Sequence, residues 1–133
     1  MTPHAFIDKW RAVELAERSA IHSHFHDLCR LLDEPDPVTA DPKGAWYTFE
    51  KGVSKTTGAK GWADVWKRGH FGWEYKSRGK DLDRASAQLQ QYAPALENPP
   101  LLIVCDTERF RIHTNWTALV PEIHEFHTED LVD

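Results

Sequence analysis

The chain has 133 residues, of which 41% are hydrophobic, and it contains six Trp and six Phe. This length suffices for one compact domain but not for two, and the apolar content excludes a disordered or fibrous protein. No apolar run approaches the ~20 residues that span a bilayer and no signal-peptide pattern begins the chain, so we expect a cytoplasmic protein without a membrane partner. Cys29 and Cys105 lack metal-ligand spacing, which predicts buried free thiols.

The net charge of −5 is unevenly distributed along the chain. Residues 51–80 hold eight Lys or Arg but only two acids, Asp64 and Glu74, so this segment carries a net charge of +6 and the remainder carries −11. A basic segment that surrounds two acids is typical of a phosphate-facing surface with a metal site. The alternative is an ordinary basic loop.

The first part of the chain is expected to be helical. A short helix over residues 3–10 begins at Pro3 and has an apolar face of Phe6, Ile7 and Trp10. A longer helix is predicted over residues 13–32, because apolar side chains recur on one face at Ile21, Phe25, Leu28 and Leu32. Glu17 lies one turn before Ile21, where an acid either reaches solvent or serves a site.

Three histidines, His22, His24 and His26, fall within the longer helix. A helix turns by about 100° per residue, so three residues spaced two apart cannot converge on one ion. Only His22 and His26 share a face, and no third ligand accompanies them. We therefore do not expect a zinc site there.

The middle of the chain has the pattern of a small β-structure. Residues 33–44 contain three prolines and four acids and are expected to form a loop, and residues 46–53 have the aromatic and β-branched content of a strand. A polar loop follows over residues 54–61. Two runs of apolar alternation, 62–67 and 71–76, then flank a Gly-containing break, which predicts a β-hairpin.

The predicted hairpin turns at Arg68-Gly69-His70, with Gly69 in the left-handed conformation, and this register pairs Asp64 with Glu74. Carboxylates that face each other across a ladder lie roughly 5 Å apart and repel, which favours a cation between them. The alternative is a solvated polar face on which Lys76 neutralises Glu74. The opposite face is apolar and should join the core: Ala63, Val65, Phe71, Trp73 and Tyr75.

A second helix and further strands complete the chain. The helix is predicted from an Asp81 cap to residue 92 or 93, and it places Gln88 and Tyr92 on one side. Residues 101–105 read as a strand buried on both faces, residues 110–114 as another strand, and residues 122–133 as an edge strand followed by a tail. The resulting α/β fold includes a helical crossover between two parallel strands, 71–76 and 101–105.

Asp64, nine intervening residues and then Glu74-Tyr75-Lys76 resemble the PD-(D/E)XK nuclease motif, and Gln88 with Tyr92 resembles the Q-x3-Y motif of its RecB-like branch. Longer stretches resemble the N-terminal nuclease domain of single-chain restriction–modification enzymes of MmeI type, in which nuclease, adenine methyltransferase and target recognition are fused. This similarity covers residues 6–131 and includes Phe49-Glu50-Lys51-Gly52 and Gly61-Trp62-Ala63-Asp64-Val65-Trp66-Lys67-Arg68-Gly69.

The resemblance implies a restriction-endonuclease-like mixed β-sheet flanked by helices, with a PD-(D/E)XK core. It implies a single nuclease domain over residues 1–133 that is the N-terminal domain of a longer chain. The implied activity is Mg²⁺- or Mn²⁺-dependent hydrolysis of phosphodiester bonds in double-stranded DNA, within a restriction–modification enzyme for phage defence. The implied partners are methyltransferase and target-recognition domains in the same or a neighbouring chain, and a second copy for double-strand cleavage.

The resemblance also implies roles for individual residues. Asp64 and Glu74 would be metal ligands, together with the Tyr75 carbonyl and Glu17, and Lys76 would be the catalytic lysine. Gln88 and Tyr92 would brace the site and contact the substrate. Basic residues would bind phosphates without reading sequence: Lys51, Lys55, Lys60, Arg68, Arg78 and Lys80. His22 departs from the family pattern, which tends to have Gln there.

Two other functions remain open from the sequence. One is a catalytically silent nuclease fold that serves as a DNA-binding or docking module. The other is a standalone RecB-like nuclease from a different defence or repair system.

Overall fold

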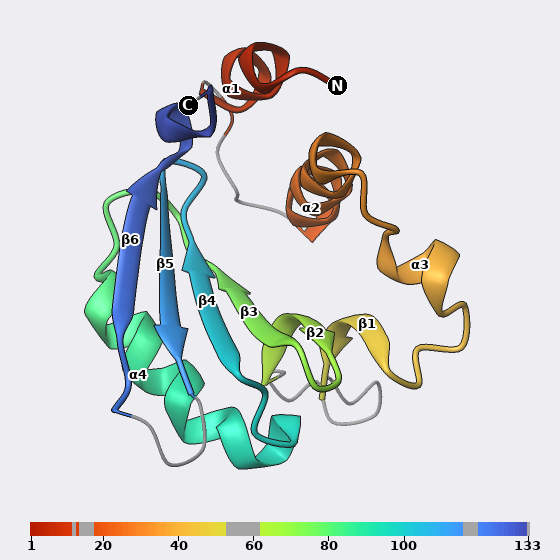
Figure 1. Ribbon diagram of the computed structural model, residues 1–133, viewed down its shortest axis with the longest axis vertical. Helices are drawn as coiled ribbons and strands as arrows, with labels where there is room; N and C mark the ends of the chain where they lie inside the picture. The colour runs from red at the N-terminus through yellow and green to blue at the C-terminus, as the bar shows by residue number, and fades with distance from the viewer. Residues whose placement is uncertain (12, 14–17, 53–61, 116–119, 133) are drawn as a thin grey trace.

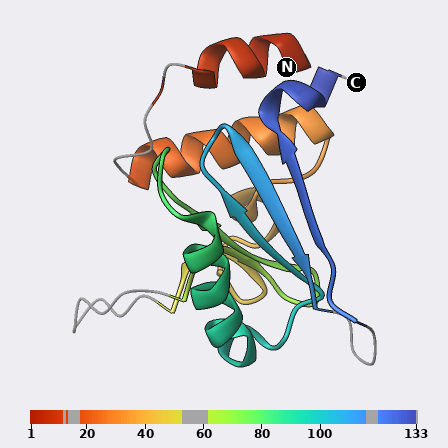
Figure 2. The same ribbon diagram turned by 90° about the vertical axis from the view of Figure 1, so that its left-hand side faces the viewer.

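The computed structural model describes the chain except for residues 12, 14–17, 53–61, 116–119 and 133. In the described residues, six strands form one mixed sheet with helices on both faces (Figure 1, Figure 2). In chain order the elements are α1 (Pro3–Arg11), α2 (Arg18–Leu32), α3 (Pro37–Ala40), β1 (Tyr47–Lys51), β2 (Ala63–Lys67), β3 (Phe71–Tyr75), α4 (Leu82–Tyr92), η1 (Ala93–Leu96), β4 (Leu101–Cys105), β5 (Arg109–Thr114), β6 (Ile123–His127) and η2 (Thr128–Val132).

The strands are ordered in the sheet as they are in the chain, from β1 to β6. Neighbouring strands are antiparallel except β3 and β4, which run parallel and are joined through α4. This connection confirms the predicted crossover between residues 71–76 and 101–105. Parallel neighbours need such a crossover, and α4 therefore covers one face of the sheet while α1 and α2 cover the other.

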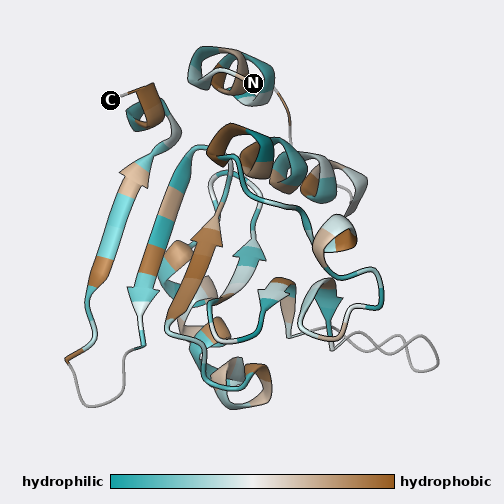
Figure 3. Ribbon diagram, turned by 45° about the vertical axis from the view of Figure 1, so that its right-hand side comes forward, coloured by the Kyte–Doolittle hydropathy of each residue, from teal (hydrophilic) through white to brown (hydrophobic). Residues whose placement is uncertain are grey.

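The central strand β4 is buried at four of its five residues, as its unbroken apolar run predicts. Figure 3 shows β4 hydrophobic along its length, whereas β5 and β6 alternate. On the α1 and α2 side, Trp73 and Tyr75 pack with Phe6 and Phe25. On the α4 side, the fully buried Trp66 packs among leucines and donates its indole N–H to the Leu96 carbonyl at 2.9 Å. Ala63 also packs on the α4 side, contrary to the predicted face.

The N-terminal elements confirm part of the prediction and correct part of it. Helix α1 buries Phe6, Ile7 and Trp10, as predicted. Helix α2 begins at Arg18 in the described residues, since Val13 is not helical and residues 14–17 lie outside them. Leu32 was predicted to lie on the buried apolar face of this helix, and this prediction is wrong. Its side chain is 58% exposed, because the helix ends there and the chain turns at Asp33 with φ +56°.

Two segments expected to be irregular contain short helices. Within residues 33–44, the Asp36 carboxylate accepts a hydrogen bond from the Thr39 N–H at 2.9 Å and begins α3, with Pro37 in its first turn. The expected tail after β6 forms η2, which packs against α1 and brings the two ends of the chain together (Figure 1). These two short helices depend on capping and on tertiary contacts. Neither produces a periodic pattern of hydrophobic residues, so the sequence did not predict them.

His24 is fully buried beneath the sheet, and it connects α2 to β3. Its Nδ1 lies 2.8 Å from the Tyr75 hydroxyl, and its ring makes edge contacts with Phe6 and Trp10. Burial lowers the pKa of His24 from 6.5 to about 3, and the nearby Asp27 carboxylate opposes this shift only partly. His24 is therefore a neutral core residue of the folded state.

This buried histidine predicts a loss of stability in acid. Because the folded-state pKa lies below the unfolded value of 6.5, His24 contributes no pH dependence above that pH, and stability falls as the pH drops from 6.5 towards 3. The unfolding free energy should decrease by about 2–3 kcal/mol between pH 7 and 4.5 through this one group. Urea unfolding at both pH values would measure it.

The matched comparison is His24→Phe against His4→Gln, since His4 is exposed. The first variant should flatten the decline between pH 7 and 4.5, and the second should leave it unchanged. An undiminished decline in His24→Phe would contradict the assignment.

Candidate functional site

The β2–β3 hairpin has the predicted register. Val65 pairs with Trp73 and Lys67 with Phe71, and Gly69 takes φ +71° in the turn. The paired residues extend to Val65 and Trp73. Beyond them the Asp64 carboxylate accepts a hydrogen bond from the Tyr75 N–H, which places Asp64 beside the end of β3, where Glu74 lies on the face towards α4. Two acids that are ten residues apart in the sequence are thereby neighbours on adjacent strands.

Glu74 and Lys76 form an ion pair on this face. The Lys76 Nζ lies 3.4 Å from a Glu74 carboxylate oxygen, and the side chains are 26% and 8% exposed, respectively. A carboxylate this deeply buried needs a cation close by, because desolvation strongly disfavours its charged form. Lys76 supplies that charge and also extends to the edge of an open groove.

Asp64 is joined to the same centre through the backbone. Its Oδ2 accepts a hydrogen bond from the Tyr75 N–H at 2.7 Å. Tyr75 is buried and its hydroxyl reaches His24 on the opposite side of the sheet, and burial raises the pKa of this phenol well above its ordinary value. Tyr75, which lies between Glu74 and Lys76, is therefore held by its backbone through Asp64 and by its side chain through His24.

The donor set at this centre fits a hard divalent cation. The carboxylates of Asp64 and Glu74 and a backbone carbonyl such as that of Tyr75 are the oxygen ligands that Mg²⁺ and Mn²⁺ prefer. In the described part of the chain, no three His, Cys, Asp or Glu side chains gather as a metal site. The predicted ligand Glu17 lies outside the described residues.

An open groove of about 970 Å³ lies beside this centre, where β3 ends and α4 begins. The carboxyl ends of parallel strands are the usual position for ligands in open α/β sheets. The carboxylate of Asp81 in its wall accepts hydrogen bonds from the Asp83 and Arg84 N–H groups and caps α4. The groove is lined by Tyr75, Lys76, Ser77, Gly79, Lys80, Asp81, Arg84, Ala85, Ala87, Gln88 and Gln91.

The two predicted residues of α4 have different surroundings. Gln88 lines the groove together with Lys76. Tyr92, one turn further along, packs at the edge of the apolar cluster between α4 and the sheet. Two groove residues, Arg84 and Gln91, were missed from the sequence. Arg84 lies four residues before Gln88 and Gln91 lies three residues after it. Residues at these spacings share a helix face, so the sequence could have identified both as neighbours of Gln88.

The predicted phosphate-binding residues do not all lie on one surface. Lys80 lines the groove. Lys51 and Arg68 instead lie over the ring of Trp66, at 4.2 and 5.4 Å from its centroid, and Arg68 pairs with Glu97 at 2.8 Å. Two further predicted positions, Lys55 and Lys60, lie outside the described residues.

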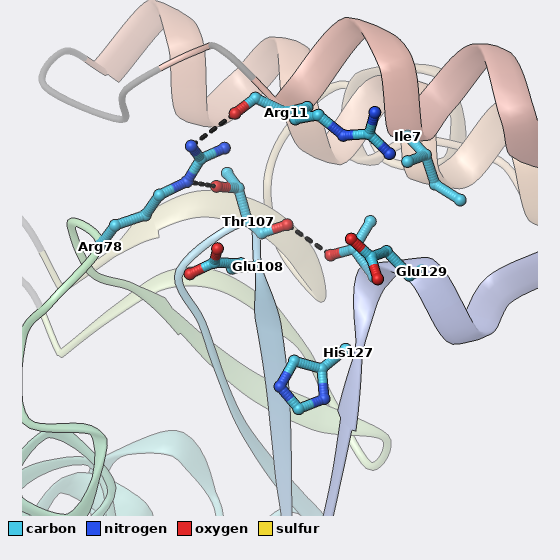
Figure 4. A pocket seen from close by; sticks show the side chains of 8 residues that line it. Ile7, Arg11, Arg78, Thr107, Glu108, His127 and Glu129 are labelled. Atoms are coloured by element: carbon cyan, nitrogen blue, oxygen red, sulfur yellow. Dashed lines mark hydrogen bonds between the residues drawn. The ribbon is translucent and has the colours of Figure 1, made fainter.

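Arg78 points away from the groove and ties α1 to the sheet. Its guanidinium donates hydrogen bonds to the Arg11 carbonyl and to Thr107 Oγ1 at 2.9 Å (Figure 4). It also donates to the Trp10 carbonyl at 2.6 Å, so it binds the last turn of α1. The Thr107 carbonyl in turn accepts a hydrogen bond from Thr128 at the start of η2. These contacts border a small pocket of about 110 Å³ and join four segments of the chain.

The three histidines of α2 divide between two environments, as the helical rotation predicts: His22 and His26 share a face and both contact the Phe49 ring, whereas His24 lies in the core. His22 stacks on Phe49 with centroids 4.0 Å apart, and His26 Nδ1 lies 3.5 Å from an Asp36 carboxylate oxygen. His24 enters the core between these two positions.

The fold and this centre define an α/β domain with two acids and a lysine on one hairpin, beside a basic groove. The chain belongs to the family described as MmeI, N-terminal domain, whose model matches residues 1–133. The predicted family is thereby confirmed, and it associates the chain with MmeI-type restriction–modification enzymes. No curated protein and no solved structure matches the chain. None of the described helices is long and apolar enough to cross a bilayer.

The contacts of Arg78 predict a structural effect on substitution. Arg78→Lys keeps the charge but loses the forked donors, so the unfolding free energy should fall by about 1–3 kcal/mol. Urea unfolding would measure this loss. An unfolding free energy equal to the parent's would contradict this structural role of Arg78.

Proposed function

We propose that this domain is a metal-dependent endonuclease that hydrolyses phosphodiester bonds in double-stranded DNA, within an MmeI-type restriction–modification enzyme. The observation that carries the proposal is the position of Lys76, 3.4 Å from Glu74 and at the edge of a basic groove, with Asp64 bonded to the intervening residue. Membership of the MmeI family supports it. The mixed sheet with helices on both faces is consistent with a restriction-endonuclease-like core.

Asp64, Glu74 and the Tyr75 carbonyl would hold Mg²⁺ or Mn²⁺. When bound, such an ion polarises a phosphate oxygen and lowers the pKa of a coordinated water. The Lys76 ammonium group, held by Glu74, would orient the attacking water and stabilise the negative charge that grows on the phosphate in the transition state. Gln88, facing the same groove, would hydrogen-bond the phosphate and keep it in line for attack.

Sequence recognition would come from outside this domain. Contacts from the Lys, Arg and Gln side chains of the groove to phosphates would position the duplex and carry no sequence information. Methyltransferase and target-recognition domains, in the same or a neighbouring chain, would select the site. A second copy of the domain would cut the other strand.

Substitution at the centre should remove cleavage and leave the fold in place. Lys76→Ala and Asp64→Ala should each slow nicking of supercoiled plasmid in Mg²⁺ by about 100-fold or more, since each removes a group that acts on the transition state. Gel analysis of nicking rates measures this effect, and thermal unfolding verifies folding. The matched control is Lys43→Ala, an exposed lysine away from the groove.

Nicking by either variant at the parent's rate would refute the proposal. A parent protein that binds DNA, yet neither cleaves it nor gains thermal stability in Mn²⁺, would instead support the silent DNA-binding module. A downstream adenine methyltransferase in the same reading frame would separate the fused enzyme from a standalone nuclease.

A further inference from the structure

We infer that the exposed face of α4 is a phosphate-binding track, in which Arg84 and Gln91 extend the groove along the strand being cut. The inference rests on the proposed function and adds a binding mode to it. Arg84, Gln88 and Gln91 are the polar side chains that α4 contributes to the groove beyond its Asp81 cap. The opposite face of the helix is buried in the core at Leu82, Ala85, Ser86 and Leu89.

The chemistry of the groove selects an anion. Its cations are Lys76, Lys80 and Arg84, and the Asp81 carboxylate is the acid among its lining residues. That carboxylate is engaged in capping α4, with Oδ1 2.9 Å from the Asp83 nitrogen. The apolar lining side chains on α4 are only alanines, so the wall offers little surface to a hydrophobic ligand.

Arg84 differs from several arginines whose charge is used within the fold. Arg78 binds main-chain carbonyls, Arg109 pairs with Asp106 at 3.1 Å, and Arg111 pairs with Asp83 and Glu125. Within the described part of the chain, the exposed side chains of Lys80 and Arg84 make no ion pair. Their charges are therefore available to a ligand in the groove.

The position of Arg84 in α4 is unfavourable for the helix itself. It is the third residue of the first turn, where the helix dipole favours acids and disfavours cations by about 0.3–1 kcal/mol. An arginine there does not stabilise the helix end, and its placement beside Lys80 points to a ligand instead.

Arg84 and Gln91 line the same groove two turns apart on α4. Arg84 and Gln91 are separated by about 10.5 Å along the helix axis, since each residue rises about 1.5 Å. Two side chains this far apart contact different phosphates, so a strand that runs along α4 would present a separate phosphate group to each. Lys76 lies at the β3 end of the same groove, so the phosphates beside α4 would flank the one being hydrolysed.

The test is DNA binding without divalent metal. The affinity of the protein for a labelled duplex would be measured by fluorescence anisotropy in EDTA at several salt concentrations. Arg84→Ala should weaken binding about tenfold and lower the slope of log affinity against log salt by about 1, the value for one lost phosphate contact. Arg84→Lys should retain most of the slope.

The matched control is Arg30→Ala, which removes the same charge from an exposed helical position on α2. It should leave the slope at the parent's value. In Mg²⁺, Arg84→Ala should raise the KM for cleavage, and high DNA concentration should recover most of the rate. Arg84→Gln serves as a second variant if the alanine variant unfolds.

An unchanged slope in Arg84→Ala and Arg84→Gln, or a change equal to that of Arg30→Ala, would overturn the inference. Because the binding assay contains no metal, its result is separate from the cleavage test. A lower salt slope in Arg84→Ala, together with unchanged nicking by Lys76→Ala, would support phosphate binding along α4 and refute the proposed nuclease activity. An unchanged slope in Arg84→Ala, together with slower nicking by Lys76→Ala, would support the nuclease activity and refute phosphate binding along α4.

Discussion

The hydrogen bond from the Tyr75 N–H to the Asp64 carboxylate holds the candidate centre together. Adjacent strands bring Asp64 and Glu74 side by side, where like charges repel unless other groups compensate. The amide satisfies one acid and the Lys76 ammonium satisfies the other. The resulting arrangement is stable enough to fold and still presents several oxygen donors on one face. These two contacts explain why a hairpin tolerates two acids at this position, and the divalent ion proposed above would add to the compensation.

The sheet then separates structural and chemical roles between its two faces. Below β3, the His24–Tyr75 pair is enclosed by aromatic rings and is neutral. Above it, α4 is anchored by a leucine-rich cluster around Trp66. Gly72 permits this close approach, since a Cβ there would lie 2.8 Å from the Leu96 side chain. The crossover helix that the parallel β3–β4 pair requires is thus also the wall of the groove.

Local patterns predicted the elements that local forces determine. The hairpin register followed from alternation and Gly69, and the start of α4 followed from the Asp81 cap. Features that depend on distant partners could not be predicted in this way. Arg78 contacts a carbonyl that precedes it by 68 residues, and Leu32 is exposed because its helix stops at the surface. Neither arrangement leaves a periodic signal in the sequence.

The same distinction applies to the basic residues of the candidate site. A count of charges between residues 51 and 80 selects cations by their distance from Asp64 along the chain. In the folded chain these cations lie on different surfaces. Lys51 and Arg68 lie over the Trp66 ring, and Arg78 binds α1. Lys80 lines the groove. Arg84 falls outside that window but shares a helix face with Gln88. Gln88 of the α4 motif was therefore a better guide to the lining of the groove than the local net charge, because helical geometry fixes which side chains point together.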